Sequence, residues 1–283
     1  MKILITGANG FLSHFLIEKL RIKNKIYKVD LPKLNILNFQ KINKFIQKSK
    51  PDLIIHTAAA KGANKSNLDP KTFIDVNASG TLNICESMRL NKIKNLVYIS
   101  SCSFYKRNNK EIHENSPIDN NTPYGFSKYL GEQIINYYSN KYSFNSISLR
   151  PNLITGNRLK EDNLFYSIID EVEKKGTATV YGDGKHIREF IHPLDIYQAI
   201  KLWIRKKKKK KFEYYNISNN RYKIIDAIKR TLIFLKKGKI VLNKKTSSVF
   251  SVRLNCKKIK RELKWKPKLD LNYIIKDNYE FFK

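Results

Sequence analysis

The segment ILITGANGFLSHFL, residues 3–16, carries the pattern that decides the fold. A short apolar run from Lys2 to Thr6 predicts a strand, and the apolar spacing from Phe11 to Arg21 predicts a helix. Gly7 and Gly10 lie between them. A strand that leads through a glycine-rich turn directly into a helix is typical of the start of a βαβ unit.

The turn between this strand and helix has the composition of a phosphate loop. Gly7 permits a tight turn, Gly10 lets the backbone approach a pyrophosphate, and the amides at the helix start face an anion. The spacing is Gly-x-x-Gly-x-x-Ser instead of Gly-x-Gly-x-x-Gly, and Ser13 is small enough to keep helix and strand close. An ordinary turn is the alternative, but the position after an N-terminal strand favours a dinucleotide site.

Asp30 closes the second expected strand about 20 residues further on, where a carboxylate can accept the adenosine ribose hydroxyls and repel a 2′-phosphate. NAD is therefore favoured over NADP. Lys33 stands nearby and could accommodate the phosphate, which leaves NADP open. A loop aspartate in the turn before Pro32 is the structural alternative.

Strand-like and helix-like segments alternate along the first half of the chain, which is typical of a parallel sheet covered by helices. We expect an α/β fold, a Rossmann-like doubly wound parallel sheet with a smaller C-terminal α/β substrate-binding region. The expected domains are residues 1–155 and 156–283, with a segment near 186–204 returning to the first. The strands are Lys2 to Thr6, Lys25 to Val29, Leu53 to His56, Leu96 to Ile99 and Ser146 to Leu149, and the later helices are Gln40 to Gln47, Thr72 to Leu90 and Tyr124 to Asn140.

Composition bounds the function classes. The formal charge of +32 would suggest a nucleic-acid partner, but only 11 of the 56 basic residues are arginine, the residue that base readout and bidentate phosphate contacts favour. The dense run Arg205 to Lys211 reads as an exposed connection, with a nonspecific polyanion contact as the alternative. We expect no specific nucleic acid as a partner.

Cysteine, histidine and hydropathy patterns point to a reduced compartment without a metal. Cys85, Cys102 and Cys256 are far apart, and the five histidines are scattered, so neither a disulfide framework nor a metal site is indicated. No run of about 18 apolar residues is present. We therefore expect a soluble cytoplasmic protein without a membrane partner.

The stretch TPYGFSKYLGE, residues 122–132, places Tyr124 four residues before Lys128. Thr122 is a good helix N-cap and Pro123 fits the first helical position, so the phenol and the ammonium should lie one turn apart on one helix face. A cation there would lower the pKa of the phenol and so favour its use as a proton acceptor. A pair that only decorates a solvated face is the alternative.

With these motifs in order, the sequence resembles the extended short-chain dehydrogenase/reductases, the family of NAD-dependent nucleotide-sugar epimerases, dehydratases and ketoreductases. Further matching motifs stand along nearly the whole chain. They are PDLIIHTAAA (51–60), DVNASGTLNI (75–84), LVYISSCSFY (96–105), LRPN (149–152), VYGDGKHIREFIHPLD (180–195) and LKWKP (263–267).

The resemblance implies roles for individual residues. Asn77 would tie down the strand that carries Ser100, and the catalytic triad would be Ser101, Tyr124 and Lys128. Lys128 would also anchor the nicotinamide ribose. The cofactor-binding residues would be Gly7, Asn9, Gly10, Phe11, Leu12, Asp30, Ile36, Ala58, Ala59, Lys61, Asn77, Ser100, Tyr124, Lys128 and Pro151.

The resemblance also implies a nucleotide-diphosphate sugar as substrate. Arg188 matches the arginine that clamps the diphosphate in relatives, and Asn152 a residue that touches substrate phosphate; Ser101 and Ser103 would contact the sugar. A surface ion pair is the alternative for Arg188. The family resemblance further implies a homodimer.

Departures from the family pattern narrow the expected reaction. The 4,6-dehydratases carry an Asp-Glu pair where Cys102 and Ser103 stand here, so a dehydratase is disfavoured. Cys102 is interpreted as pocket lining. The stretch from Ala58 to Lys61 is closer to 4-epimerases, whereas the short run from Asp30 to Pro51 is closer to 4-ketoreductases. A non-catalytic NAD(P)-binding sensor or scaffold is the alternative class, although such relatives typically lose the tyrosine or the lysine.

Overall fold

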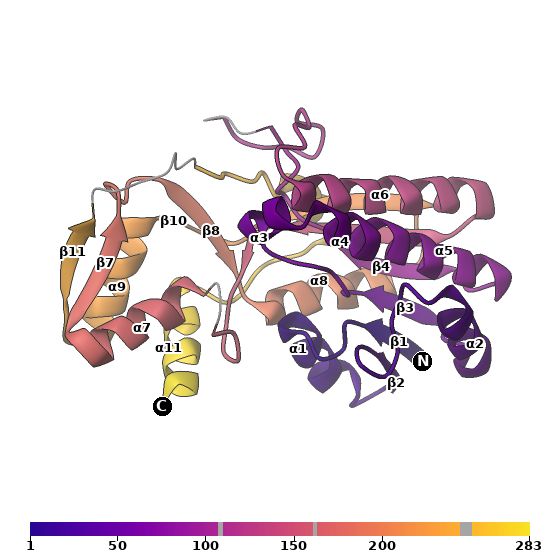
Figure 1. Ribbon diagram of the computed structural model, residues 1–283, viewed down its shortest axis with the longest axis horizontal. Coiled ribbons are helices and arrows are strands. Elements are labelled where there is room, and N and C mark those ends of the chain that lie inside the picture. Colours follow the sequence, from indigo (N-terminus) through magenta and orange to yellow (C-terminus); the bar gives the residue numbers. More distant parts are fainter. Residues whose placement is uncertain (107–109, 161–162, 244–250) are drawn as a thin grey trace.

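The computed structural model describes residues 1–106, 110–160, 163–243 and 251–283 (Figure 1). Its main feature is a six-stranded parallel sheet in the order β2-β1-β3-β4-β5-β9. The expected Rossmann-like α/β fold class is confirmed. The strands are β1 (Lys2–Thr6), β2 (Lys25–Val29), β3 (Leu53–His56), β4 (Asn95–Ile99), β5 (Asn145–Pro151) and β9 (Phe212–Ile217).

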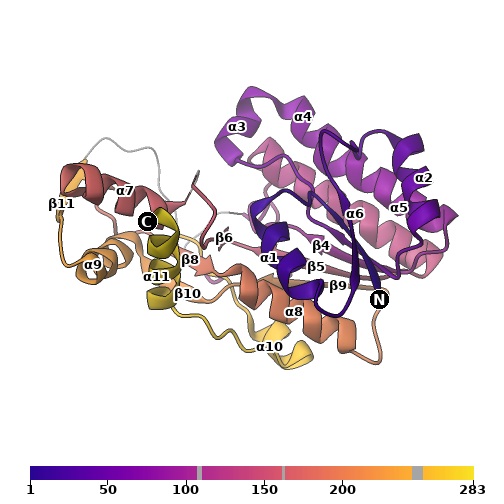
Figure 2. The same ribbon diagram turned by 90° about the horizontal axis from the view of Figure 1, so that it is seen from below.

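Helices cover both faces of this sheet (Figure 2). Alternating strand residues such as Ile3 and Ile5 pack toward the face that carries α1 and α8, whereas Leu4 between them packs toward the face of α2, α5 and α6. All three are fully buried, and burying such a side chain stabilises the fold by about 1.5–3 kcal/mol. The covering helices are α1 (Phe11–Leu20), α2 (Phe39–Ser49), α5 (Gly80–Leu90), α6 (Pro123–Tyr142) and α8 (Pro193–Arg205).

The expected single helix from Thr72 to Leu90 is wrong in detail. The structure has α3 (Ala63–Leu68), α4 (Pro70–Ile74), a π-helical turn over Asp75–Ser79 and then α5. In the π-helical turn the Asn77 carbonyl accepts a hydrogen bond from the Thr81 hydroxyl at 2.6 Å, and the Asn77 side chain is turned toward other elements. A helix that widens to i→i+5 bonding leaves no signature in the apolar spacing of the sequence.

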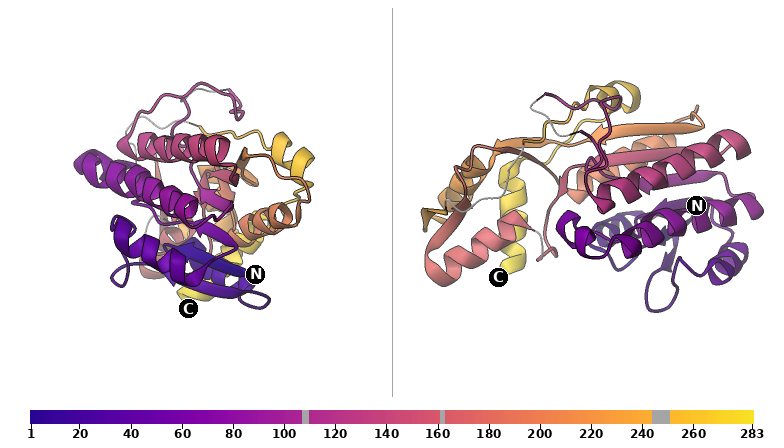
Figure 3. Two further views of the ribbon diagram at one scale, coloured as in Figure 1. Left: turned by 90° about the vertical axis from the view of Figure 1, so that its right-hand side faces the viewer. Right: turned by 45° about the horizontal axis from the view of Figure 1, so that its top comes forward.

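A second, smaller hydrophobic core lies beside the sheet (Figure 3). It joins α7, β7, β8, α9 and α11, with a three-stranded sheet β10-β8-β6 and a two-stranded sheet β11-β7. The boundary near residue 155 stays a prediction. The elements after β5, besides α8 and β9, are β6 (Leu153–Ile154), α7 (Leu164–Lys175), β7 (Thr177–Tyr181), β8 (Ile187–Ile191), β10 (Asn220–Lys223), α9 (Ile224–Leu235), β11 (Lys239–Asn243), α10 (Lys257–Leu263) and α11 (Leu271–Phe282).

The basic run after α8 is engaged with the fold itself. The Lys209 ammonium donates to the carbonyls of Ile204 and Lys206, which end the helix, and lies over the Trp203 ring at 5.2 Å. Lys206 pairs with the buried Glu213. These lysines stabilise the negative end of the α8 dipole. Within the described residues, none of the helices is both long and apolar enough to traverse a lipid bilayer.

The order of the strands reverses between β1 and β3, because the chain passes from β1 to β2 on one side and returns to β3 on the other. Ligands of open parallel sheets bind at the carboxyl ends of the strands at such a reversal. The loop after β1, the segment after β3 and the segment after β4 therefore converge on the candidate site.

Candidate active site

Gly7 lies where the two segments at the strand reversal touch. Its φ is +64°, and a Cβ added there would lie 2.7 Å from both the backbone nitrogen and the Cα of Ala58. Only glycine combines this left-handed conformation with so close an approach. The phosphate loop and the segment after β3 are thus packed backbone to backbone.

The N-terminus of α1 fits an anionic group. Gly10, the N-cap, makes no side-chain cap hydrogen bond, and the first turn contains no acidic residue. The amides of Phe11, Leu12 and Ser13 are at the positions that have no partner within a helix. The backbone and dipole of this turn therefore suit the pyrophosphate of a dinucleotide, as the sequence predicts.

Asp30 lies beside this loop, at the end of β2. One carboxylate oxygen accepts the Asn9 backbone N–H at 2.7 Å and the other accepts the Leu31 N–H at 2.8 Å. Each carboxylate oxygen has a further acceptor site, so two ribose hydroxyls can still bind. The Asn9 side chain donates to the Leu31 carbonyl at 3.1 Å. Asn9 thereby fastens the loop to Asp30, and its direct contact with a pyrophosphate stays a prediction.

The segment after β3 carries the half-buried Ala58 and Ala59 and the exposed Lys61. Asn77 holds this segment, because its amide accepts from the Ala60 N–H at 2.8 Å and donates to the Ala60 carbonyl at 3.0 Å. The same side chain donates to the Ser127 hydroxyl on α6 at 2.9 Å. The expectation that Asn77 ties down the strand before Ser100 is therefore wrong: it ties the segment after β3 to the helix of Tyr124.

Three further expected cofactor residues are buried near the same edge. Ile36 packs onto α5, where a Cβ on Gly80 would lie 2.6 Å from its Cδ1. Pro151 ends β5, and its carbonyl accepts the Cys102 N–H at 3.1 Å. The Ser100 hydroxyl is buried and lacks a hydrogen-bond partner in the described part of the chain. Such an orphaned donor fits a site that a ligand completes.

Ser101 and Tyr124 lie together although they come from different elements. Ser101 follows β4, its hydroxyl donates to the Ser103 hydroxyl at 2.8 Å, and it lies near enough to the Tyr124 phenol to lower the pKa of that phenol. Gly125 permits this approach, since a Cβ there would lie 2.8 Å from the Ser103 carbonyl oxygen. Thr122 caps α6 by accepting the Gly125 N–H at 3.1 Å, as the sequence predicts. The structure thus brings the expected serine and tyrosine together.

The pKa values of Tyr124 and Lys128 differ from the expectation. Burial raises the pKa of Tyr124, and the nearby Ser101 hydroxyl only partly offsets this rise. Burial also lowers the pKa of Lys128 to about 7, against the attraction of the Glu132 carboxylate. The phenol pKa is therefore raised and not lowered as expected from an adjacent ammonium, because desolvation is the largest effect on both groups.

Two of the expected substrate residues, Asn152 and Arg188, come from the part of the chain after β5. The Asn152 side-chain nitrogen, between β5 and β6, is buried without a hydrogen-bond partner within the described residues. Arg188 lies on β8, close enough to lower the pKa of Cys102 electrostatically while burial raises that pKa to about 12. Ser103 accepts from Ser101. The expected substrate residues therefore include a cationic side chain near Cys102 and an orphaned amide directly after β5.

Comparison with known proteins identifies the family of this chain. The family model described as "NAD dependent epimerase/dehydratase family" matches residues 3–218. A protein of Methanocaldococcus jannaschii, provisionally named a UDP-glucose 4-epimerase, is 30% identical, and the match covers 97% of this chain and 96% of that protein. The chain belongs to the NAD-dependent epimerase/dehydratase family. The expected resemblance and the expected enzyme class are confirmed.

Solved structures of the epimerase/dehydratase family have the same fold. The UDP-glucuronic acid 4-epimerase of Bacillus cereus, solved with UDP-glucuronic acid and NAD, superposes with a TM-score of 0.90 at 22% identity, covering 100% of this chain and 99% of that one. The dTDP-glucose 4,6-dehydratase DesIV of Streptomyces venezuelae, solved with NAD, gives a TM-score of 0.85 at 21% identity, covering 99% and 97%. The expectation of NAD as the cofactor agrees with the family.

Sequence reasoning missed several residues that shape the site of this family member. The Phe73 ring meets the Tyr124 ring edge to face at 6.2 Å, and Lys128 lies 4.1 Å from the centre of the Tyr98 ring. Glu132 and Arg150 form a buried ion pair one turn beyond Lys128. Phe73 carries no signal in the sequence, but Glu132 continues the four-residue spacing of Tyr124 and Lys128 and could have been found from it.

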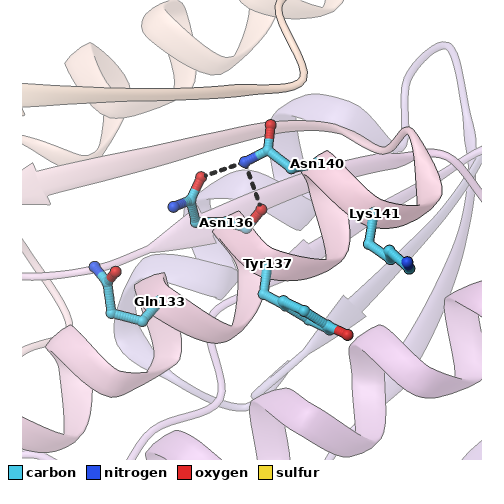
Figure 4. A pocket seen from close by; sticks show the side chains of 5 residues that line it. All are labelled: Gln133, Asn136, Tyr137, Asn140 and Lys141. Atoms are coloured by element: carbon cyan, nitrogen blue, oxygen red, sulfur yellow. Dashed lines mark hydrogen bonds between the residues drawn. The ribbon is translucent and has the colours of Figure 1, made fainter.

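A shallow hollow on the outer face of α6 lies away from this site (Figure 4). Asn136 and Asn140 are joined there by a hydrogen bond of 2.8 Å, and Tyr137 and Lys141 extend along the helix. The hollow contains neither a catalytic candidate nor a residue of the phosphate loop. It is lined by Gln133, Asn136, Tyr137, Asn140 and Lys141.

Proposed function

We propose that the protein is an NAD-dependent 4-epimerase of a nucleotide-diphosphate sugar, with Tyr124 as the acid and base at the sugar's fourth carbon. One observation carries the proposal. Tyr124 and Ser101 lie together, with Lys128 one helical turn from Tyr124, at the carboxyl edge of the sheet whose strand reversal holds the Gly7 loop.

Three side chains perform the proton chemistry. Tyr124 takes the proton of the C4 hydroxyl and later returns it to the C4 oxygen, acting as base and then as acid. Ser101 turns its hydroxyl from Ser103 to the same oxygen and holds it within reach of the phenol. Lys128 favours the phenolate by its charge and anchors the ribose. Bound NAD supplies a hydride acceptor at C4 and gives the hydride back.

Two features support a 4-epimerase over a 4,6-dehydratase. Elimination of water needs its own acid and base, but Cys102 and Ser103 occupy the places of the dehydratase carboxylates, and burial raises the pKa of Cys102 to about 12. Relatives that match most of this chain are named UDP-glucose and UDP-glucuronate 4-epimerases. A 4-ketoreductase is the second candidate, supported by the short connection between Asp30 and α2.

In this proposal, Arg188 and Asn152 bind the diphosphate of the substrate. A guanidinium can bind a diphosphate through two hydrogen bonds, and the orphaned Asn152 amide supplies a further donor. Assembly as a homodimer and a cytoplasmic location are part of the proposal and rest on the family resemblance and the reduced cysteines.

The deciding experiment measures conversion and cofactor together. The purified protein is incubated with UDP-glucose or UDP-glucuronate and NAD, the C4 epimer is followed by proton NMR, and NADH absorbance is recorded. We expect epimer without net NADH. Stoichiometric consumption of added NADH with a nucleotide-linked 4-keto-6-deoxyhexose would show a reductase instead, and cofactor binding with neither reaction would show a sensor.

A further inference from the structure

On α6, the four-residue spacing of Tyr124 and Lys128 continues to a third residue, the buried Glu132. Tyr124, Lys128 and Glu132 follow one another at four-residue spacing on α6 and share one face. Lys128 is 2% exposed and Glu132 is 0% exposed. A buried carboxylate such as Glu132, one helical turn from a lysine, is costly unless it is held in place.

Glu132 is held by two residues of β5. One carboxylate oxygen accepts the Ser148 hydroxyl at 2.6 Å and the Arg150 Nε at 3.0 Å, and the other accepts Arg150 Nη2 at 2.5 Å. Arg150 is itself stabilised by the Tyr105 hydroxyl at 2.6 Å and by the Glu114 carbonyl at 3.0 Å. The carboxylate is thus fixed at a defined place behind Lys128.

Among the described residues, the other groups that face Lys128 do not supply negative charge. His56 of β3 is neutral, since burial, followed by the Lys128 charge, lowers its pKa to about 3. Tyr98 of β4 presents its ring at 4.1 Å, and burial raises its pKa well above the usual value. Tyr124 is protonated in this structure because burial raises its pKa. Arg150 of β5 is cationic and lies behind Glu132.

Burial therefore works against the charge of Lys128, and Glu132 is the carboxylate that opposes this effect. We propose that Glu132 is a positioning residue for the reaction: fixed by Ser148 and Arg150, it keeps the Lys128 ammonium charged and so sets the alkaline limit of activity. The role of Lys128 in turnover rests on the proposed function. The electrostatic coupling between Glu132 and Lys128 does not.

The first test compares pH–rate profiles of the parent and Glu132→Gln. Without the carboxylate, Lys128 loses its proton at lower pH, so the alkaline limb of kcat/KM should move down by about one pH unit. Glu132→Asp keeps the charge and should restore most of the limb. Glu213→Gln is the matched control. Glu213 lies on β9, is also a buried carboxylate, and pairs with Lys206 at the end of α8.

The second test needs no turnover. A lysine whose pKa is lowered on folding makes stability rise with pH, from about 7 in the folded protein towards 10.5 in the unfolded chain. The free energy of unfolding is measured by urea denaturation from pH 6 to pH 10 for the parent, Glu132→Gln, Lys128→Met and the double variant. Glu132→Gln should start this rise at lower pH, and Lys128→Met should abolish it in both backgrounds.

The two tests separate the possible failures. If no sugar is turned over but the stability cycle shows the coupling, the proposed function fails and the coupling stands. An unchanged alkaline limb, or stability curves in which Glu132→Gln has the same effect with and without Lys128, overturns the inference. If Glu132→Gln does not fold because Arg150 is left unpaired, Glu132→Gln with Arg150→Gln removes both charges and undergoes the same comparison.

Discussion

The Lys128 ammonium lies 4.1 Å from the centre of the Tyr98 ring and is almost entirely removed from solvent. The ring face offers the cation a partial substitute for water. Gly131 makes this placement possible, because a Cβ there would lie 2.5 Å from the Tyr98 hydroxyl oxygen. The position of Lys128 is therefore determined by an aromatic residue of β4 and a glycine of its own helix.

Replacing Tyr124 with phenylalanine should remove the acid and base without disturbing the fold. The ring still meets Phe73 edge to face, and only the phenol hydroxyl beside Ser101 is lost. We expect kcat to fall by about 10²–10⁴-fold, the usual contribution of a positioned acid or base. NAD binding, measured by quenching of protein fluorescence, should be nearly unchanged. Turnover close to that of the parent would contradict the assignment of Tyr124.

Replacing Gly7 with alanine should destabilise the protein and weaken cofactor binding. The left-handed conformation costs about 1–2 kcal/mol for a residue with a Cβ. The contact with the Ala58 backbone adds about 1–3 kcal/mol of overpacking. Gly176→Ala is the matched control, because Gly176 has a φ of +67° but no atom of the described residues lies within 4 Å of the added Cβ. Equal losses of unfolding free energy in the two variants would contradict the close approach at Gly7.

The first half of the fold was predictable because its signals are local. A strand, a glycine-rich turn and a helix follow within 20 residues, and the same alternation repeats up to β5. The N-cap at Thr122 and the pairing of Tyr124 with Lys128 on one helix face follow from spacing alone. The sequence therefore predicts which side chains meet on α6, and the resemblance adds Ser101 from a distant loop.

The remaining features depend on tertiary contacts. The π-helical turn at Asn77 joins Ala60 to Ser127, which are 67 positions apart, and neither position carries a local signal. The ionisation of Tyr124 and Lys128 was predicted from their mutual charge, but burial sets the direction for both. Desolvation depends on everything packed around a group, and spacing along one helix does not contain that information.

Cys102 should resist alkylation in the folded protein. Burial raises its pKa to about 12, so at pH 8 only about one thiol in 10⁴ is ionised, roughly a thousandfold fewer than for an ordinary thiol. Iodoacetamide at pH 8 should leave activity intact, and mass spectrometry should find Cys102 modified only after denaturation in urea. Turnover by Cys102→Ala close to that of the parent would agree with a lining role. Rapid inactivation by alkylation would instead show a reactive thiolate.

Replacing Arg188 with lysine should affect substrate binding more than turnover. Lysine keeps the charge but cannot form two parallel hydrogen bonds to a diphosphate. The loss of one charge-assisted hydrogen bond, about 1.5–3 kcal/mol, corresponds to a KM for the nucleotide-sugar that rises by about 10–100-fold while kcat changes less. The matched control is Lys185→Met, in the exposed turn between β7 and β8, which should leave KM unchanged. If Arg188→Lys lowers the unfolding free energy and leaves KM unchanged, Arg188 is a structural residue, and the diphosphate must be bound by other residues near Asn152.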